Sequence, residues 1–102
     1  MKPFCEFMVK EIFPCLRAKV AQDLMDNYNI SQNKAAELMG ITQPAVSQYM
    51  RSLRGRNKKI VEQEEIKKRI KEISEKLYNK KISKDDLSEQ FCAICDILAK
   101  SS

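Results

Sequence analysis

Amide, hydroxyl and guanidinium side chains are frequent between residues 31 and 52, and they can form hydrogen bonds with a macromolecular partner. The predicted helix that holds them turns five residues outward: Gln43, Pro44, Ser47, Gln48 and Arg51. A Gln amide can pair with adenine, and Arg can reach guanine or a phosphate. A Ser hydroxyl can form a hydrogen bond with several different bases. Pro44 or Ala45 can contact the methyl group of thymine. These residue types predict readout of base edges in DNA.

The charge around this segment fits the same partner. No Asp or Glu occurs between Gly40 and Lys59, and a carboxylate there would face the phosphates that flank a groove. Residues 1–59 contain ten Lys and Arg against five Asp and Glu, whereas residues 60–102 contain nine of each. The net charge of +5 therefore belongs to the half with the polar helix. Three more residues are expected to contact phosphates: Thr42, Arg54 and Lys58. A basic surface that only faces water would have the same composition.

Four cysteines form the second set of residues that could do chemistry: Cys5, Cys15, Cys92 and Cys95. The last two form a Cys-x-x-Cys within a predicted helix, which places both sulfurs on one face. Zinc and iron–sulfur clusters usually require four ligands, so a metal site would also need the first two. The chain has no His, so a zinc site would be all-thiolate or would include a carboxylate.

This metal site meets a geometric difficulty and has alternatives. Ten residues of unbroken helix would separate Cys5 from Cys15 by about 15 Å. The helix must therefore break near Pro14, or two subunits must share the site. In a second arrangement Cys5 joins the Cys-x-x-Cys while Cys15 belongs to the core. All four can also be small buried apolar side chains, and thiols also serve in redox sensing. The sequence leaves these alternatives open.

The elements that must position these residues are helical. The chain has two Gly, three Pro, no alternation of β-branched residues and many helix-forming side chains. Residues with capping chemistry mark the helix ends: Ser31, Gly40, Thr42 and Ser83 with Asp86. We therefore predict an all-α fold. Its expected helices cover residues 4–28 with a kink near Pro14, 32–39, 43–53, 59–78 and the segment after Ser83.

Within residues 31–52 the apolar positions fit two helices that cross at a tight turn. Ala36 is small where the helices meet, and Gly40 supplies the positive φ that the turn needs. Ile41 fills the apolar gap after the turn. Val46 and Tyr49 face inward and hold the second helix to the first. Leu38 and Met39 supply the other side of this small core.

Residues 32–49 resemble the helix-turn-helix of Cro- and repressor-type DNA-binding proteins. More widely, the chain is similar to archaeal XRE-type transcriptional regulators. Four features carry that similarity: the start Pro3-Phe4-Cys5-Glu6, the spacing of Pro14, Arg17 and Ala21, the pair Arg54-Gly55, and the late Cys92-Ala93-Ile94-Cys95. The resemblance implies a repressor that binds double-stranded DNA, with Gln32 contacting a phosphate. It also implies a homodimer on a palindromic operator, with half-sites about 34 Å apart.

We predict two regions. Residues 1–57 form the helix-turn-helix DNA-binding domain, and residues 58–102 form a helical region for dimerisation or sensing. An apolar stripe on the charged helix can pack on the chain's own helix-turn-helix or on a second subunit: Ile66, Ile70, Ile73 and Leu77. We expect a symmetric homodimer built from residues 59–100.

Other classes of function are disfavoured. The chain has no His, no Gly-rich phosphate loop and no carboxylate pair beside a nucleophile, so we do not expect an enzyme. No apolar stretch approaches the ~18 residues of a membrane span, so we expect a cytoplasmic protein with reduced thiols. One alternative is a redox- or metal-responsive regulator that holds zinc or an iron–sulfur cluster, although no cofactor is certain. A further alternative is an antitoxin-like or protein-interaction module.

Overall fold

The computed structural model describes residues 6–55 and 58–101, with side chains described up to residue 99. It is 85% helical, and the described residues contain no strand, which confirms the all-α prediction. The elements follow in this order: the π-helix η1 (Met8–Ile12), α2 (Phe13–Tyr28), α3 (Gln32–Met39), α4 (Gln43–Arg51), the 3-10 turn η2 (Ser52–Arg54), α5 (Lys58–Val61), α6 (Glu64–Tyr78), the 3-10 turn η3 (Lys84–Asp86) and α7 (Leu87–Ser101).

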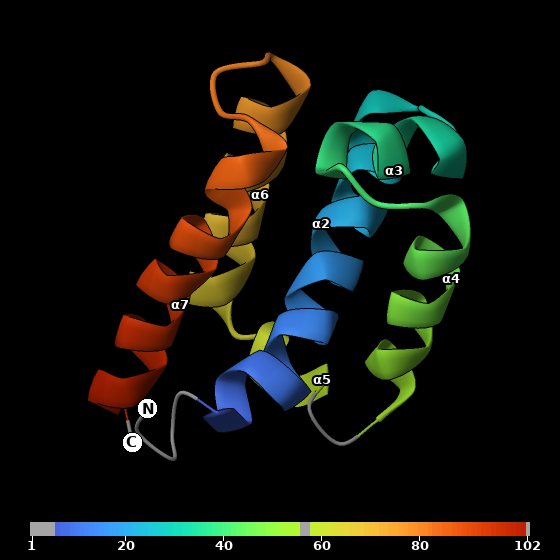
Figure 1. Cartoon of the computed structure of the whole chain (residues 1–102). Helices are drawn as coiled ribbons and strands as arrows, with labels where there is room; N and C mark the ends of the chain where they lie inside the picture. The colour runs from blue at the N-terminus through green and yellow to red at the C-terminus, as the bar shows by residue number, and fades with distance from the viewer. Residues whose placement is uncertain (1–5, 56–57, 102) are drawn as a thin grey trace.

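Helix α2 is the centre of the molecule. In Figure 1 it runs between α6 and α7 on one side and α3 and α4 on the other. Seven of its residues are buried: Phe13, Cys15, Leu16, Ala18, Val20, Ala21 and Leu24. A helix with apolar residues on several faces must be covered on several sides, and here the other helices cover it.

The predicted kink near Pro14 corresponds to a change in helix type. Five residues of π-helix end at Ile12, and α2 begins at Phe13 with Pro14 in its first turn. Proline lacks an N–H and is best accommodated at the start of a helix, where that donor has no partner within the helix. Helix α2 ends at Tyr28, and Asn29 adopts the left-handed conformation with φ of 52°.

The prediction of one helix over residues 59–78 is wrong. Helix α5 ends at Val61, Gln63 is extended, and α6 begins at Glu64. Both Val61 and Ile66 are fully buried. In a continuous helix, five residues would place these side chains about 140° apart, on different faces. The break allows both to enter the core.

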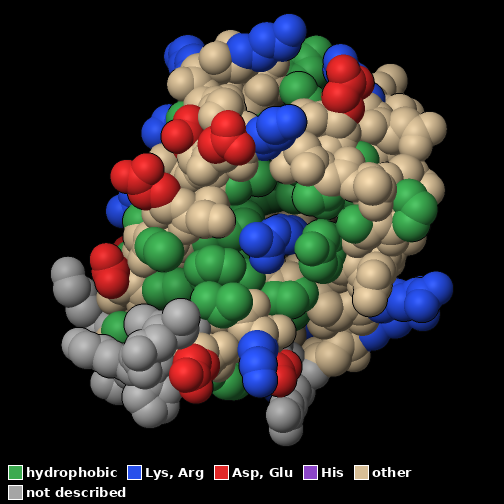
Figure 2. All heavy atoms as spheres, viewed as in Figure 1, with side chains coloured by type: hydrophobic (Ala, Val, Ile, Leu, Met, Phe, Trp, Pro, Cys, Tyr) green, Lys and Arg blue, Asp and Glu red, His purple; other side chains and the backbone are tan. Residues whose placement is uncertain are grey.

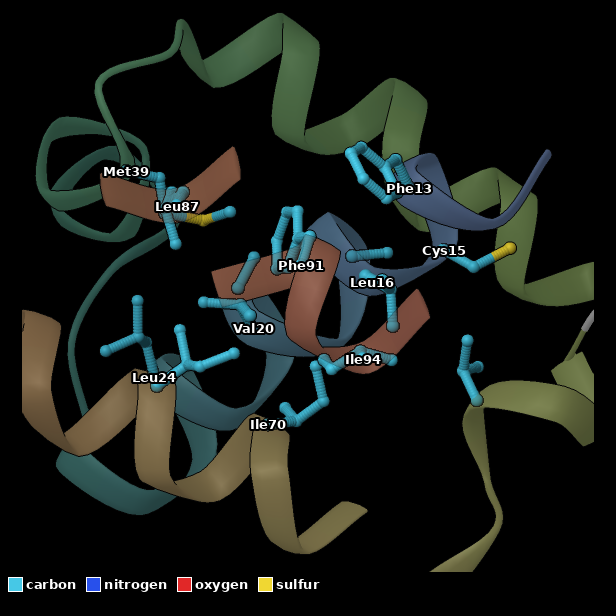
Figure 3. Packing of buried hydrophobic residues seen from close by; sticks show 14 of the residues in the cluster. Phe13, Cys15, Leu16, Val20, Leu24, Met39, Ile70, Leu87, Phe91 and Ile94 are labelled. Carbon is cyan, nitrogen blue, oxygen red and sulfur yellow. The ribbon is translucent and has the colours of Figure 1, made fainter. Parts of the chain in front are cut away.

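The apolar stripe of α6 packs within its own chain. Its members are at most 4% exposed: Ile66, Ile70, Ile73 and Leu77. Figure 3 shows Ile70 beside Leu24 of α2. The Ser74 hydroxyl, also buried, donates to the carbonyl of Val20 at 3.5 Å. A second subunit therefore cannot use this stripe, although the predicted homodimer can use another surface.

Helix α7 lies on the same side of α2 as α6 and completes the cover of the core there. The predicted capping box is present, because Ser83 accepts from the backbone of η3 and its own N–H donates to Asp86 at 2.9 Å. Phe91 and Ile94 point toward Leu16 and Val20 of α2 (Figure 3). The ring of Phe91 meets that of Phe13 edge-on, with centroids 5.4 Å apart. Buried residues before and after the predicted boundary at residues 57–58 belong to one hydrophobic cluster.

Tyr28 stacks on Tyr78 with ring centroids 4.0 Å apart, which joins the ends of α2 and α6. Desolvation, followed by the negative charges of Glu75 and Asp23, raises the pKa of Tyr28 above 10.0.

Among the described helices, none has the length and apolar content needed to cross a membrane.

Candidate nucleic-acid interface

Capping hydrogen bonds begin α3 and α4 at the residues that the sequence predicted. The Ser31 hydroxyl accepts from the backbone N–H of Lys34 at 3.1 Å and begins α3. The Thr42 hydroxyl accepts from Ala45 N–H at 3.2 Å and begins α4, with Pro44 in the first turn. These bonds satisfy backbone donors that a helix start leaves without partners. The two helices and their turn are a helix-turn-helix, which confirms that part of the resemblance.

The turn between the helices requires glycine for two reasons. Gly40 has φ of +71°, a conformation that side chains with a Cβ rarely adopt. A Cβ at this position would also overlap carbons of the Lys84 side chain, which belongs to η3. Ala36 and Val46, both buried, fill the contact beside the turn. The helix-turn-helix is thus packed against the segment that leads into α7.

The outward face of α4 carries the predicted reading residues. Pro44, Gln48 and Arg51 are exposed, and Gln43 and Ser47 are half-buried. Tyr49 and Val46 lie on the other face, as predicted. Figure 2 shows basic side chains projecting near the lower end of α4. The face therefore combines amide, hydroxyl and guanidinium groups.

A hydrogen-bonded cluster joins α3 to the middle of α4. The side-chain amide of Gln32 donates to the Ser47 hydroxyl at 2.6 Å, and that of Gln43 donates to the same oxygen at 3.3 Å. A hydroxyl can accept two bonds and still donate one. Ser47 therefore keeps a donor for a ligand, while its neighbours fix its position. Gln32, which the resemblance predicts to contact a phosphate, lies beside the outward face of α4.

Below this face lies a cavity of about 710 Å³ between α2, α4 and α5. Its walls consist of Lys19, Gln22, Gln32, Ser47, Met50, Arg51, Leu53, Arg54, Lys58 and Glu62. Five of the predicted DNA-contacting residues are brought together here: Gln32, Ser47, Arg51, Arg54 and Lys58. The other four do not line it: Thr42, Gln43, Pro44 and Gln48. The cavity holds four cations and one carboxylate, so it suits a phosphate backbone.

Sequence reasoning missed Lys19 and Glu62 in this cavity. The Lys19 ammonium lies 3.4 Å from a carboxylate oxygen of Glu62, and the Lys58 ammonium lies 3.8 Å from the same oxygen. Lys19 and Glu62 are 43 positions apart, so no local pattern could have paired them. The only signal for Glu62 in the sequence is its position, because it is the first acidic residue after the stretch from Gly40 to Lys59 that lacks Asp and Glu.

The cysteines do not assemble as a four-thiol site in the described part of the chain. Cys15 is buried, and its Sγ lies 3.5 Å from the carbonyl oxygens of Glu11 and Ser52. Figure 3 shows this sulfur turned away from α7. No three described His, Cys, Asp or Glu residues could hold a metal ion. Cys92 is exposed, Cys95 is half-buried, and Cys5 lies outside the described residues. Cys15 therefore has the core role that the sequence had left open.

Comparison with known proteins identifies a family for this part of the chain. The family model of the ParB HTH domain matches residues 11–71. That range contains α3, the turn at Gly40 and α4, together with α2 and α5. No curated protein and no solved structure matches the chain.

Proposed function

Since this chain belongs to the family of the ParB HTH domain, a helix-turn-helix DNA-binding fold, we propose that it is a sequence-specific transcriptional regulator. In this proposal it is a cytoplasmic repressor and not an enzyme, and it binds a palindromic operator as a homodimer.

One observation carries the proposal: the reading face of α4 continues into the cationic cavity beside it. Gln48 and Ser47 present hydrogen-bonding groups that base edges can distinguish. Arg54 and Lys58 lie in the cavity wall, where a phosphate backbone would run. DNA-binding proteins combine these two kinds of contact, because phosphate contacts position the protein and base contacts specify the sequence.

Selection of bound sequences from a random DNA pool tests the proposal. We expect enrichment of an inverted repeat and a steep loss of affinity with added salt. Affinity for the enriched sequence should exceed that for unrelated DNA by roughly a thousandfold or more. Equal binding of all sequences would contradict sequence-specific regulation while leaving DNA binding itself intact.

Loss of a cavity cation should weaken binding to every sequence alike. We expect Arg54→Ala or Lys58→Ala to reduce affinity for the enriched and for unrelated DNA by the same factor. Each should lower the slope of log affinity against log salt by about 1, because one phosphate contact is lost. Titrations at several salt concentrations measure this slope. Lys68→Ala, on the exposed side of α6, is the matched control and should change nothing. A sequence-dependent loss would place these residues at base edges instead.

Removal of the cavity carboxylate, Glu62, should raise the affinity for DNA. Glu62 repels phosphates and engages Lys19 and Lys58. We expect Glu62→Gln to raise affinity for all DNA by roughly fivefold, since a unit charge at close range in water contributes about 1 kcal/mol. Its salt dependence should be steeper than that of the unmodified protein. Glu65→Gln, an exposed carboxylate in the first turn of α6, serves as the control. A fall in affinity would mean that Glu62 mainly holds the two lysines in place.

A further inference from the structure

The side chain of Arg17 on α2 lies among three aromatic rings. Its guanidinium carbon lies 5.7, 5.6 and 5.6 Å from the ring centroids of Phe13, Tyr49 and Phe91. These rings belong to α2, α4 and α7, so one cation touches the central helix, the reading helix and the last helix. In the described part of the chain Arg17 has no hydrogen bond and no ion pair. A guanidinium has five N–H donors, so those of the half-buried Arg17 are available to an acceptor from a partner.

The surroundings of Arg17 form an apolar hollow. Figure 2 shows apolar side chains around a recess between α7 and α4, with a basic side chain within it. In Figure 1 these two helices lie on opposite sides of α2, which forms the floor. The apolar walls reduce screening by water, so a carboxylate that reaches Arg17 would bind more strongly than at an open surface. The hollow therefore fits a segment that carries a carboxylate among small or apolar side chains.

The outward face of α7 has this composition. Glu89 and Asp96 are exposed and seven positions apart, which places them on one side of the helix. Cys92 and Ala93 are exposed between them, and their small side chains allow another surface to approach closely. Among the described residues neither carboxylate forms an ion pair. Within the described residues, the chain thus carries both a cation without an ion pair in a hollow and an acidic helix face without ion pairs.

We propose that a second copy of this chain seats its α7 in the hollow, so that Asp96 of each copy pairs with Arg17 of the other. Two-fold symmetry forms both pairs at once, because each copy offers the hollow and the helix. This places the homodimer of the proposed function at α7 and α2, since the apolar stripe of α6 is already buried. Arg17 and Lys19 are two positions apart, about 200° around α2. The DNA cavity beside Lys19 therefore stays open.

Charge reversal in two variants tests this interface. Sedimentation equilibrium at micromolar concentration should give twice the chain mass of 11.8 kDa. Asp96→Lys and Arg17→Glu should each raise the dimer Kd by roughly 30-fold or more. An equimolar mixture of the two variants should restore the dimer, because the mixed pair contains one native and one reversed ion pair. Glu72→Lys on α6 is the matched control and should remain dimeric.

The outcomes separate this interface from the proposed function. A monomeric unmodified protein, a dimeric Asp96→Lys variant or a mixture that fails to restore the dimer would each overturn the interface. Circular dichroism checks the fold of each variant. If Arg17→Glu unfolds, the exposed Asp96→Lys variant alone decides. A monomer that protects one half-site would remove the interface and leave DNA binding intact. A charge-dependent dimer without sequence preference would instead overturn the proposed function.

Discussion

Gly40→Ala is expected to cost the protein about 2–5 kcal/mol of its free energy of unfolding. The left-handed backbone contributes about 1–2 kcal/mol, because any Cβ there approaches the following carbonyl oxygen. The overlap with Lys84 contributes about 1–3 kcal/mol, the usual cost of an overpacked site. A small domain has a total stability of about 5–15 kcal/mol, so this one change can remove a third of it. Urea denaturation followed by circular dichroism measures the loss.

Two further variants separate the two causes. Gly55→Ala is the matched control, because Gly55 is extended and a Cβ there would meet only the Ser52 carbonyl oxygen at 3.4 Å. It should be close to neutral. In a Lys84→Gly background, which removes all three overlapping carbons, Gly40→Ala should lose the overlap cost and keep the backbone cost. A Gly40→Ala protein as stable as Gly55→Ala would contradict both reasons and would mean that the turn relaxes freely.

Local features of the fold were predictable because their causes lie within a few residues. Ser31, Thr42 and Ser83 each cap a helix through a bond to a backbone group two or three positions away. Gly40 ends α3 because of its own conformational freedom. The pair of helices that presents the reading face follows from these short-range bonds. The sequence therefore predicted which side of α4 faces outward, although Gln43 and Ser47 are half-buried there.

Features that depend on distant contacts were not predictable in the same way. The apolar spacing of residues 66–77 fits a longer helix, and only the core around α2 shows why the chain breaks at Gln63. The cavity beside α4 depends on Lys19 meeting Glu62 across 43 positions. Arg17 acquires two of its three aromatic neighbours, Tyr49 and Phe91, only when α4 and α7 pack on α2. Each of these required the tertiary arrangement.

Gln48→Ala should remove discrimination at one base pair of the operator without changing the stability of the protein. Gln48 is exposed and has no hydrogen bond within the described chain, so its truncation leaves no buried group unpaired. A bidentate contact to a base distinguishes the right from the wrong base by about 1–3 kcal/mol, a factor of roughly 5 to 150. The variant should bind the enriched sequence more weakly by this factor and unrelated DNA equally well. Competition titrations with single-base variants of the site identify the position affected.

Gln43→Ala should also relax specificity, but its effect has two parts. Gln43 donates to Ser47, so its truncation would remove the proposed base contact and would also loosen the hydroxyl that Gln32 still holds. We therefore expect altered preference at more than one base pair, whereas Gln48→Ala alters one. Gln63→Ala, an exposed amide outside α4, is the control and should leave specificity intact. If both α4 variants retain the preference of the unmodified protein, α4 does not read the bases. The cationic cavity would then account for binding that is independent of sequence.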